Sequence, residues 1–274
     1  MKKLLPLLLL SWLSLASHAE LPSIIIVIDD IGHSYELGQQ AILLPGPINY
    51  AVLPHSPNGQ RLAELAHQQG KEVLLHAPMS TVDGTPAGPG ELGPQLNQQQ
   101  FIYRLQQNLN NIPYVVGLNN HMGSLLTQMP KPMAWLMAEL KRQQLYFLDS
   151  RTSPLTVAED TAQRYHIPHL KRDVFLDNQR NPAAITKQFE KLLRLANKQG
   201  YAVAIGHPYP ETIAVLQQTL PSLALRGYQQ QLVSRFLTPP STPCPAHNSL
   251  DYLLNKPCRG KGPTPNTAAV ATIK

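Results

Sequence analysis

The chain has 274 residues, of which 43% are hydrophobic, and this is enough to bury the core of one large or two small domains. Its formal net charge at pH 7 is +6. The lysines and arginines form no block and are not interleaved with aromatic residues, which argues against nucleic acid as a partner.

The first nineteen residues form a segment of their own. Lys2 and Lys3 precede a leucine-rich run, which ends in the small-x-small pattern of Ser17, His18 and Ala19. This pattern is typical of a secretory signal peptide, and it predicts cleavage near Ala19 and a periplasmic or secreted protein. An uncleaved membrane anchor is the alternative, but the apolar run is short for a span of about 20 residues. We therefore expect no stable membrane anchor after cleavage.

Apolar, β-branched runs alternate with helical patterns from residue 21 to residue 237. The expected strands span residues 24–28, 48–53, 72–75, 115–118, 146–148, 170–176, 202–205 and 231–236, and the expected helices span 61–69, 99–109, 133–144, 185–198 and 211–220. Such alternation indicates parallel strands joined by helical crossovers. No Gly-rich phosphate loop follows the first strand, so we predict an α/β fold of a distorted or incomplete (β/α) barrel with seven to eight parallel strands.

Two regions interrupt this alternation. Residues 80–97 are rich in Gly and Pro and follow the third expected strand, so they predict a long functional loop at the active face of the barrel. Residues 238–274 are rich in Pro, Ser and Thr, which is typical of a surface tail. This tail contains the only two cysteines, Cys244 and Cys258, and in an oxidising compartment the pair predicts a disulfide.

Polar side chains stand at the carboxyl ends of most of the expected strands. In chain order they are Asp29 and Asp30, His76, Asn119 to His121, Asp149 to Arg151, Asp177 and His207. In a barrel of parallel strands these ends meet on one face, where the active sites of such folds lie. Carboxylate oxygens and imidazole nitrogens are ligands of Zn²⁺ and similar divalent ions. A bound ion would also explain two adjacent carboxylates, because it compensates one and leaves the other as a base.

Five segments in this order, "IIIVIDDIG", "LLHAPM", "NNHMGS", "FLDSRT" and "AIGHPYP", resemble the signature segments of the divergent polysaccharide deacetylases. The resemblance covers nearly all of residues 22–237. That family is related to the metal-dependent polysaccharide deacetylases, which have a distorted (β/α) barrel and remove acetyl groups from N-acetylated sugars. The resemblance therefore implies a metal-dependent hydrolase of an N-acetylated glycan or peptidoglycan-like polymer.

Position by position, the resemblance implies roles for the polar residues at the strand ends. It makes Asp29 the general base and His207 the general acid, with Asp30, His76 and His121 as ligands of a divalent metal, expected to be zinc. The better-known relatives take both histidines from one H-x-x-x-H segment, whereas Ser80 stands four residues after His76 here, so the second histidine comes from another strand. Supporting or substrate-binding roles are expected for Asn119, Asp149 and Arg151.

Structural alternatives remain open for these residues. The two acids could cap the start of a following helix, His76 and His121 could be hydrogen-bonded core histidines, and His207 could shape the turn before a helix. Asp149 could form a structural ion pair with Arg151. At the level of function, the alternatives are a catalytically silent barrel that binds glycan or an envelope protein, and a metal hydrolase of an ester or phosphate.

Overall fold

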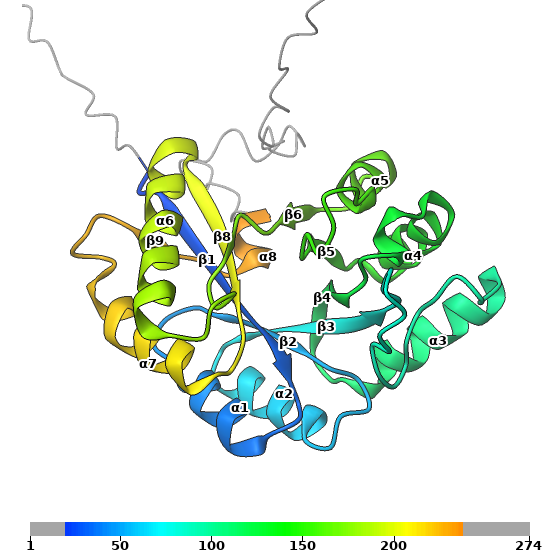
Figure 1. Ribbon diagram of the computed structural model, residues 1–274, viewed down its shortest axis with the longest axis horizontal. Coiled ribbons are helices and arrows are strands. Elements are labelled where there is room, and N and C mark those ends of the chain that lie inside the picture. The colour runs from blue at the N-terminus through cyan, green and yellow to red at the C-terminus, as the bar shows by residue number, and fades with distance from the viewer. Residues whose placement is uncertain (1–19, 238–274) are drawn as a thin grey trace, which may run out of the picture.

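A computed structural model describes residues 20–237, which are drawn in colour in Figure 1. The expected signal peptide (1–19), the expected tail (238–274) and its disulfide between Cys244 and Cys258 lie outside the described residues and stay predictions. Within residues 20–237, no helix combines the length and the apolar character that crossing a membrane requires.

A curved sheet forms the centre of the molecule, and each of its pairings within the described residues is parallel (Figure 1). The strands are β1 (Ser23–Ile31), β2 (Asn49–Val52), β3 (Glu72–Met79), β4 (Val115–Met122), β5 (Tyr146–Asp149), β6 (His169–Lys171), β7 (Val174–Phe175), β8 (Tyr201–Gly206) and β9 (Gln229–Gln230). Their spatial order is β6-β5-β4-β3-β2-β1-β8-β7, and the short β9 pairs with β1. The prediction of an incomplete (β/α) barrel with parallel strands is confirmed.

The barrel stays open between β6 and β7, although only two residues of the chain separate them. The N–H of Arg172 donates to the carbonyl of Asp149 on β5, and the N–H of Asp173 donates to the carbonyl of Val203 on β8, each at 2.9 Å. The backbone thus changes its partner strand within two residues. For this reason the single strand expected at 170–176 is observed as two short strands.

Helices surround the sheet, and all but the last and shortest of those described cover its outside (Figure 1). They are α1 (Tyr35–Ile42), α2 (Gly59–Gln68), α3 (Gln98–Asn111), α4 (Pro130–Gln143), α5 (Ala158–Tyr165), α6 (Pro182–Gln199), α7 (Pro210–Thr219) and α8 (Val233–Leu237), with 3-10 turns at Leu126–Gln128 and Leu220–Ser222. Two of the longer helices begin with a side-chain cap: Asn97 forms a capping box with Gln100 before α3, and Asn181 caps α6 ahead of Pro182.

The prediction of a strand at residues 231–236 is wrong. After β9 the chain turns into α8, where the N–H of Val233 donates to Asn49 Oδ1 at 3.0 Å. Val233 is buried among inward-facing residues of the strands, so its side chain fills the amino-terminal end of the barrel. The apolar character at this position therefore comes from a short helix that plugs the barrel and not from a strand.

Alternate residues of the strands face two separate cores. One core packs the sheet against the helices and contains Ile24, Ile26 and Ile28 of β1. The other lies inside the barrel, where Ile25 and Val27 of β1 meet inward-facing residues of other strands. Since successive side chains of a strand point to opposite faces, both faces of β1 are buried, which explains its continuous apolar sequence.

Gly117 on β4 gives room to an aromatic ring inside the barrel. A Cβ atom at this position would lie 2.3 Å from ring carbons of Tyr146, whose hydroxyl donates to buried Glu72 and so holds the ring in place. We expect Gly117→Ala to lower the free energy of unfolding by about 1–3 kcal/mol, because the ring must move out of its rotamer. Urea denaturation measures this change, with Val116→Ala, at a half-exposed neighbour, as the control. An unchanged midpoint would mean that the ring moves freely.

Candidate active site

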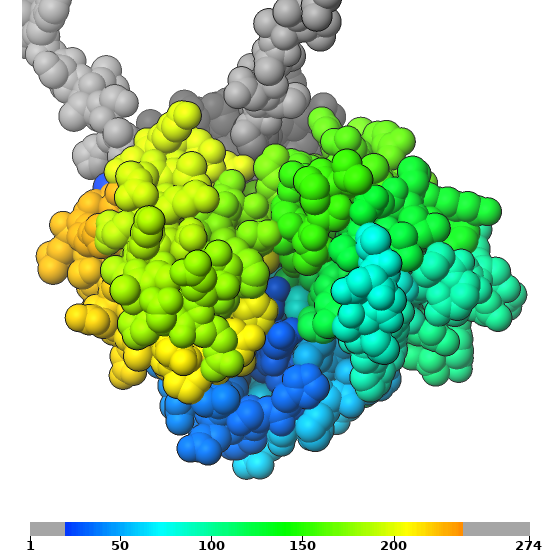
Figure 2. Space-filling model, viewed as in Figure 1, coloured from blue at the N-terminus to red at the C-terminus, as the bar shows by residue number. Residues whose placement is uncertain are grey.

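In several strands, the side chains that face the inside of the barrel are apolar along most of the strand and polar at its carboxyl end. On β1, Asp29 follows Ile25 and Val27 in phase, and directly after β8, His207 follows Val203 and Ile205. These rows of side chains end in a pocket of about 530 Å³ at the carboxyl ends of the strands. It is lined by Asp29, Asp30, His76, Asn120, His121, Met122, Ser150, Arg151, Thr152, Arg172, Phe175, Ile205, His207 and Tyr209. Figure 2 shows a hollow between the yellow and the green parts of the chain, with the blue N-terminal part at its bottom.

A bulge in β1 turns two adjacent carboxylates toward this pocket. Ile28 pairs with Tyr50 and Ile31 with Val52, so two residues of β1 stand opposite one residue of β2. Asp30 adopts a left-handed backbone conformation with φ of 57°. Bulges of this kind redirect a side chain next to an active site. Asp30 therefore lines the same pocket as its neighbour instead of facing the helices.

Three side-chain atoms of kinds that bind metals meet at the bottom of the pocket. His76 Nε2 lies 3.2 Å from Asp30 Oδ1, His121 Nδ1 lies 2.9 Å from the same oxygen, and the two nitrogens are 3.1 Å apart. Neither contact with the oxygen has the geometry of a hydrogen bond, so Asp30 Oδ1 is a buried atom without a hydrogen-bond partner among the described residues. Buried polar atoms are normally satisfied, and this one faces two imidazole nitrogens.

The spacing of these three atoms fits a divalent cation. Zinc bound at about 2.0–2.1 Å by tetrahedral ligands separates those ligands by roughly 3.3 Å, close to the distances observed. Burial acts to raise the pKa of Asp30, but the imidazoles of His121 and His76 outweigh it and hold the pKa well below its usual range. A carboxylate that stays ionised is the form that binds a cation. The donor set of Asp30, His76 and His121 therefore suits Zn²⁺ or a similar ion.

Asn119 on β4 holds two of the site residues. His76 Nδ1 donates to Asn119 Oδ1 at 2.8 Å, and Asn119 Nδ2 donates to Asp29 Oδ1 at the same distance and to Ser150 Oγ at 3.2 Å. Because Nδ1 carries the proton of this bond, Nε2 is the nitrogen left for a metal. Asn119 thus lies between the expected ligand His76 and the expected base Asp29, and its supporting role stays a prediction.

Asp29 is buried beside the three metal-ligand atoms. Its Oδ2 lies 3.6 Å from His76 Nε2, while its Oδ1 accepts the bond from Asn119. Burial raises the pKa of Asp29, although the charges of His76 and His207 oppose this shift. A carboxylate with a raised pKa is a stronger base than an ordinary aspartate.

His207 lies near the second carboxylate oxygen of Asp30, the one that does not contact the other two pocket histidines. Its Nε2 is 3.7 Å from Asp30 Oδ2, and its Nδ1 donates to Asp177 Oδ1 at 2.9 Å. Burial acts to lower the pKa of His207, but the hydrogen bond to Asp177 and its negative charge raise it to about 9. Asp177 is fixed in turn by the hydroxyl of Thr212 at 2.7 Å. The sequence placed Asp177 at a strand end but gave no sign that it orients His207.

The two remaining candidates, Asp149 and Arg151, occupy different surroundings. Asp149 is fully buried away from the pocket wall; its Oδ1 accepts the backbone N–H of Arg151 at 2.8 Å and its Oδ2 accepts the hydroxyl of Thr156 at 3.0 Å. It therefore shapes the loop after β5. Arg151 lines the pocket itself.

Arg172 is a pocket residue that the sequence analysis did not single out. It lies in the link between β6 and β7, and its Nε and Nη2 donate to the carbonyls of Ser150 at 2.7 Å and Arg151 at 2.9 Å. The sequence could have indicated this position, because alternate residues of a strand face the same side and Arg172 stands two residues after Leu170, which faces the inside of the barrel.

The fold and the pocket together define a barrel of the polysaccharide deacetylase type. A family model described as divergent polysaccharide deacetylase matches residues 26–237. The chain belongs to this family, and the resemblance found in its five sequence segments is confirmed.

Two curated proteins and one solved structure are similar to this chain. The chain is 40% identical over 211 residues to the uncharacterized protein YibQ of Escherichia coli (strain K12), a match that covers 77% of this chain but only 66% of YibQ. It is 37% identical over 198 residues to an uncharacterized protein of Haemophilus influenzae, covering 72% of this chain and 71% of that protein. A crystal structure of an uncharacterized protein from Agrobacterium tumefaciens C58 superimposes with a TM-score of 0.76 at 25% identity, over 80% of this chain and 91% of that one.

Proposed function

We propose that the protein is a metal-dependent hydrolase that removes acetyl groups from an N-acetylated envelope polysaccharide. The observation that carries this proposal is the set of three metal-ligand atoms of Asp30, His76 and His121, with a buried carboxylate beside it. Family membership supports the reaction class. The expected signal peptide supports export, which brings peptidoglycan and related polymers within reach.

Each side chain of the site has a definite task in this proposal. When bound by Asp30, His76 and His121, Zn²⁺ or a similar ion supplies polarisation of the acetamide carbonyl and acidification of water. Asp29 accepts the proton of the attacking water, and Asn119 keeps that carboxylate in place. His207 gives a proton to the departing sugar amine from Nε2, because its Nδ1 is held by Asp177. A pKa of about 9 keeps His207 protonated at neutral pH, which is the form a general acid needs.

Acetate release from defined glycans tests this proposal. We expect the purified protein, loaded with zinc, to release acetate from N-acetylglucosamine oligomers or from peptidoglycan fragments, and to lose this activity after treatment with a chelator. Restoring activity with added metal would separate a metal requirement from damage by the chelator. Stoichiometric metal without acetate release from either class of glycan would contradict the proposal and favour a silent, glycan-binding barrel.

A further inference from the structure

Two guanidinium groups line the pocket, and deacetylation of a neutral sugar does not require both. They belong to Arg151 and Arg172, and within residues 20–237 neither forms a salt bridge with a carboxylate. Other arginines do form such pairs, as Arg226 does with Glu190 at 2.8 Å. Partly buried arginines without an acidic partner are costly unless another group compensates them.

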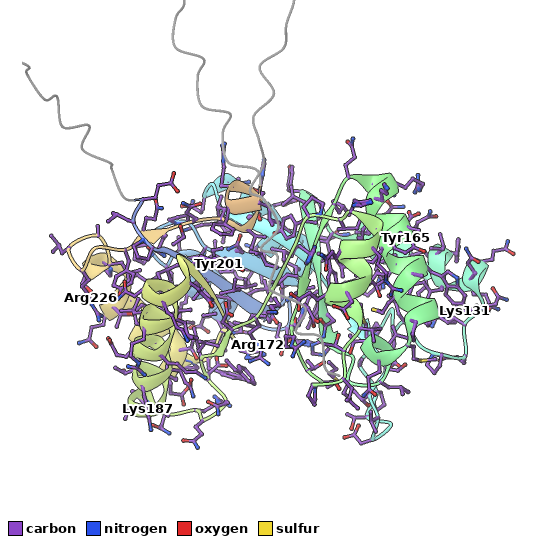
Figure 3. All side chains as sticks on the ribbon, turned by 90° about the horizontal axis from the view of Figure 1, so that it is seen from above. Lys131, Tyr165, Arg172, Lys187, Tyr201 and Arg226 are labelled. Atoms are coloured by element: carbon purple, nitrogen blue, oxygen red, sulfur yellow. The ribbon has the colours of Figure 1, made fainter. Side chains whose placement is uncertain are left out.

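Arg172 has a structural use that accounts for its presence. Its guanidinium donates to the carbonyls of Ser150 and Arg151, and it lies 5.2 Å from the ring of Phe175. Figure 3 labels it on the segment that links the two ends of the sheet. Burial lowers the pKa of the Arg172 guanidinium, and the negative charge of Asp29 opposes this shift. Arg172 therefore holds the loop after β5 and offsets the charge of Asp29.

The guanidinium of Arg151 forms no hydrogen bond and no salt bridge within residues 20–237, although its charge favours the ionised form of nearby Asp149. The backbone of Arg151 is held in an unfavourable conformation. Its φ is 53°, in the left-handed region that glycine adopts more easily. The buried Asp149 accepts its N–H at 2.8 Å, and Arg172 donates to its carbonyl at 2.9 Å. Strained residues that are fixed from both sides are common at binding sites. A glycine would relieve the strain, so the side chain of Arg151 is what this position supplies to the pocket.

The charges that line the pocket indicate what this side chain binds. Asp29 and Asp30 are balanced by Arg151 and Arg172, while His207 is paired with Asp177. The cation proposed above would add positive charge, so the pocket attracts anions. An acetamide has no charge to offer, whereas a planar guanidinium pairs well with a carboxylate or a phosphate.

We propose that Arg151 binds an oxyanion carried by the substrate, which makes the substrate an acidic N-acetylated glycan with a carboxylate or phosphate near the acetamide. This inference rests on the proposed function, because it concerns the same pocket. Arg151 thus determines specificity, whereas Asp29 and His207 carry out the reaction on acidic and neutral sugars alike.

Matched glycans and an Arg151→Gln variant test this inference. Three oligosaccharides of equal length are compared: neutral N-acetylglucosamine oligomers, oligomers that contain N-acetylmuramic acid, and phosphorylated N-acetylglucosamine oligomers. Affinity is measured by calorimetry on chelator-treated protein, and kcat/KM is measured on zinc-loaded protein. We expect Arg151→Gln to weaken binding of one acidic class by about ten- to hundredfold, as for the loss of a charged hydrogen bond, with the neutral oligomer unchanged. The acidic class that responds identifies carboxylate or phosphate.

Two further variants make the result specific to the charge in the pocket. Arg151→Lys keeps the charge and should retain part of the preference, and Arg194→Gln, at an exposed position on α6, should keep all of it. Equal affinity of the wild type for neutral and acidic glycans would overturn the inference even if acetate is released. A uniform loss for all three glycans in Arg151→Gln would also overturn it, because it would indicate a structural role. If no glycan is deacetylated but acidic binding still depends on Arg151, the proposed function fails and the inference stands.

Discussion

Replacing His76 and His121 together with alanine is expected to abolish metal binding and, with it, acetate release. The two nitrogens and Asp30 Oδ1 lie 2.9–3.2 Å from one another, so the double variant leaves a single carboxylate to hold the ion. Zinc binding of roughly 10–16 kcal/mol over four ligands is about 3 kcal/mol for each, or about two decades in Kd. Losing two ligands should therefore weaken binding by about four decades. Elemental analysis of protein purified without chelator measures this directly.

His121→Ala and His67→Ala provide the controls for this experiment. His76 is buried and bonded to Asn119, so the double variant can lose stability, whereas His121 is more accessible and its removal disturbs the fold less. His67 is exposed on α2 and stacks on Tyr114, away from the pocket, so its variant should keep full metal content. Zinc should also raise the melting temperature of the wild type and of His67→Ala, but not that of the double variant. Full metal content in a folded double variant would contradict the proposed ligands.

The barrel could be predicted from the sequence because apolar strand segments and helical patterns alternate many times along the chain. The buried run of β1 and the helical periods of α2, α3, α4, α6 and α7 each suffice to identify an element. Three α-helices of residues 20–237 were not predicted: α1 and α5, which are eight residues long, and α8, which has five residues and stands where a strand was expected. α1 has Gly38 in its middle, where a Cβ would lie 2.5 Å from Leu62, so the glycine serves the contact between α1 and α2. Whether such short helices form depends on tertiary packing more than on local helix propensity.

Residues of the candidate site could be predicted where side chains alternate regularly between the two faces of a strand, and could not be predicted where this alternation is interrupted. Asp29 and His207 follow the inward rows of their strands, so their meeting in one pocket was expected. Asp30 faces the pocket only because a bulge and a left-handed backbone turn it there, which the resemblance indicated and the period alone could not. Arg172 lies where the strand expected at 170–176 divides, and Asp177 follows the second of the two short strands, so their contacts depend on how the barrel stays open.

Asp29→Asn is expected to leave metal bound while lowering turnover by about 10²–10⁴-fold, the usual contribution of a general base. The amide has nearly the shape of the carboxylate, and its oxygen can still accept the bond from Asn119 Nδ2, which is 2.8 Å long in the wild type. What the variant lacks is a group able to take the proton of water next to the three ligand atoms. Acetate release and metal content are measured on the same preparation, so the two effects are separated.

Asp173→Asn is the matched control for this variant. Asp173 also lies beside the sheet, but its carboxylate accepts the backbone N–H of Val203 at 2.8 Å and does not line the pocket. It should keep both metal and turnover. If Asp29→Asn loses the metal, Asp29 is a ligand and not a base. If it keeps both metal and full turnover, another group takes the proton, and the position of Asp29 beside His76 has a purely electrostatic role. Loss of turnover with metal retained assigns the base to Asp29, because the substitution removes a proton acceptor and leaves the three proposed ligand atoms in place.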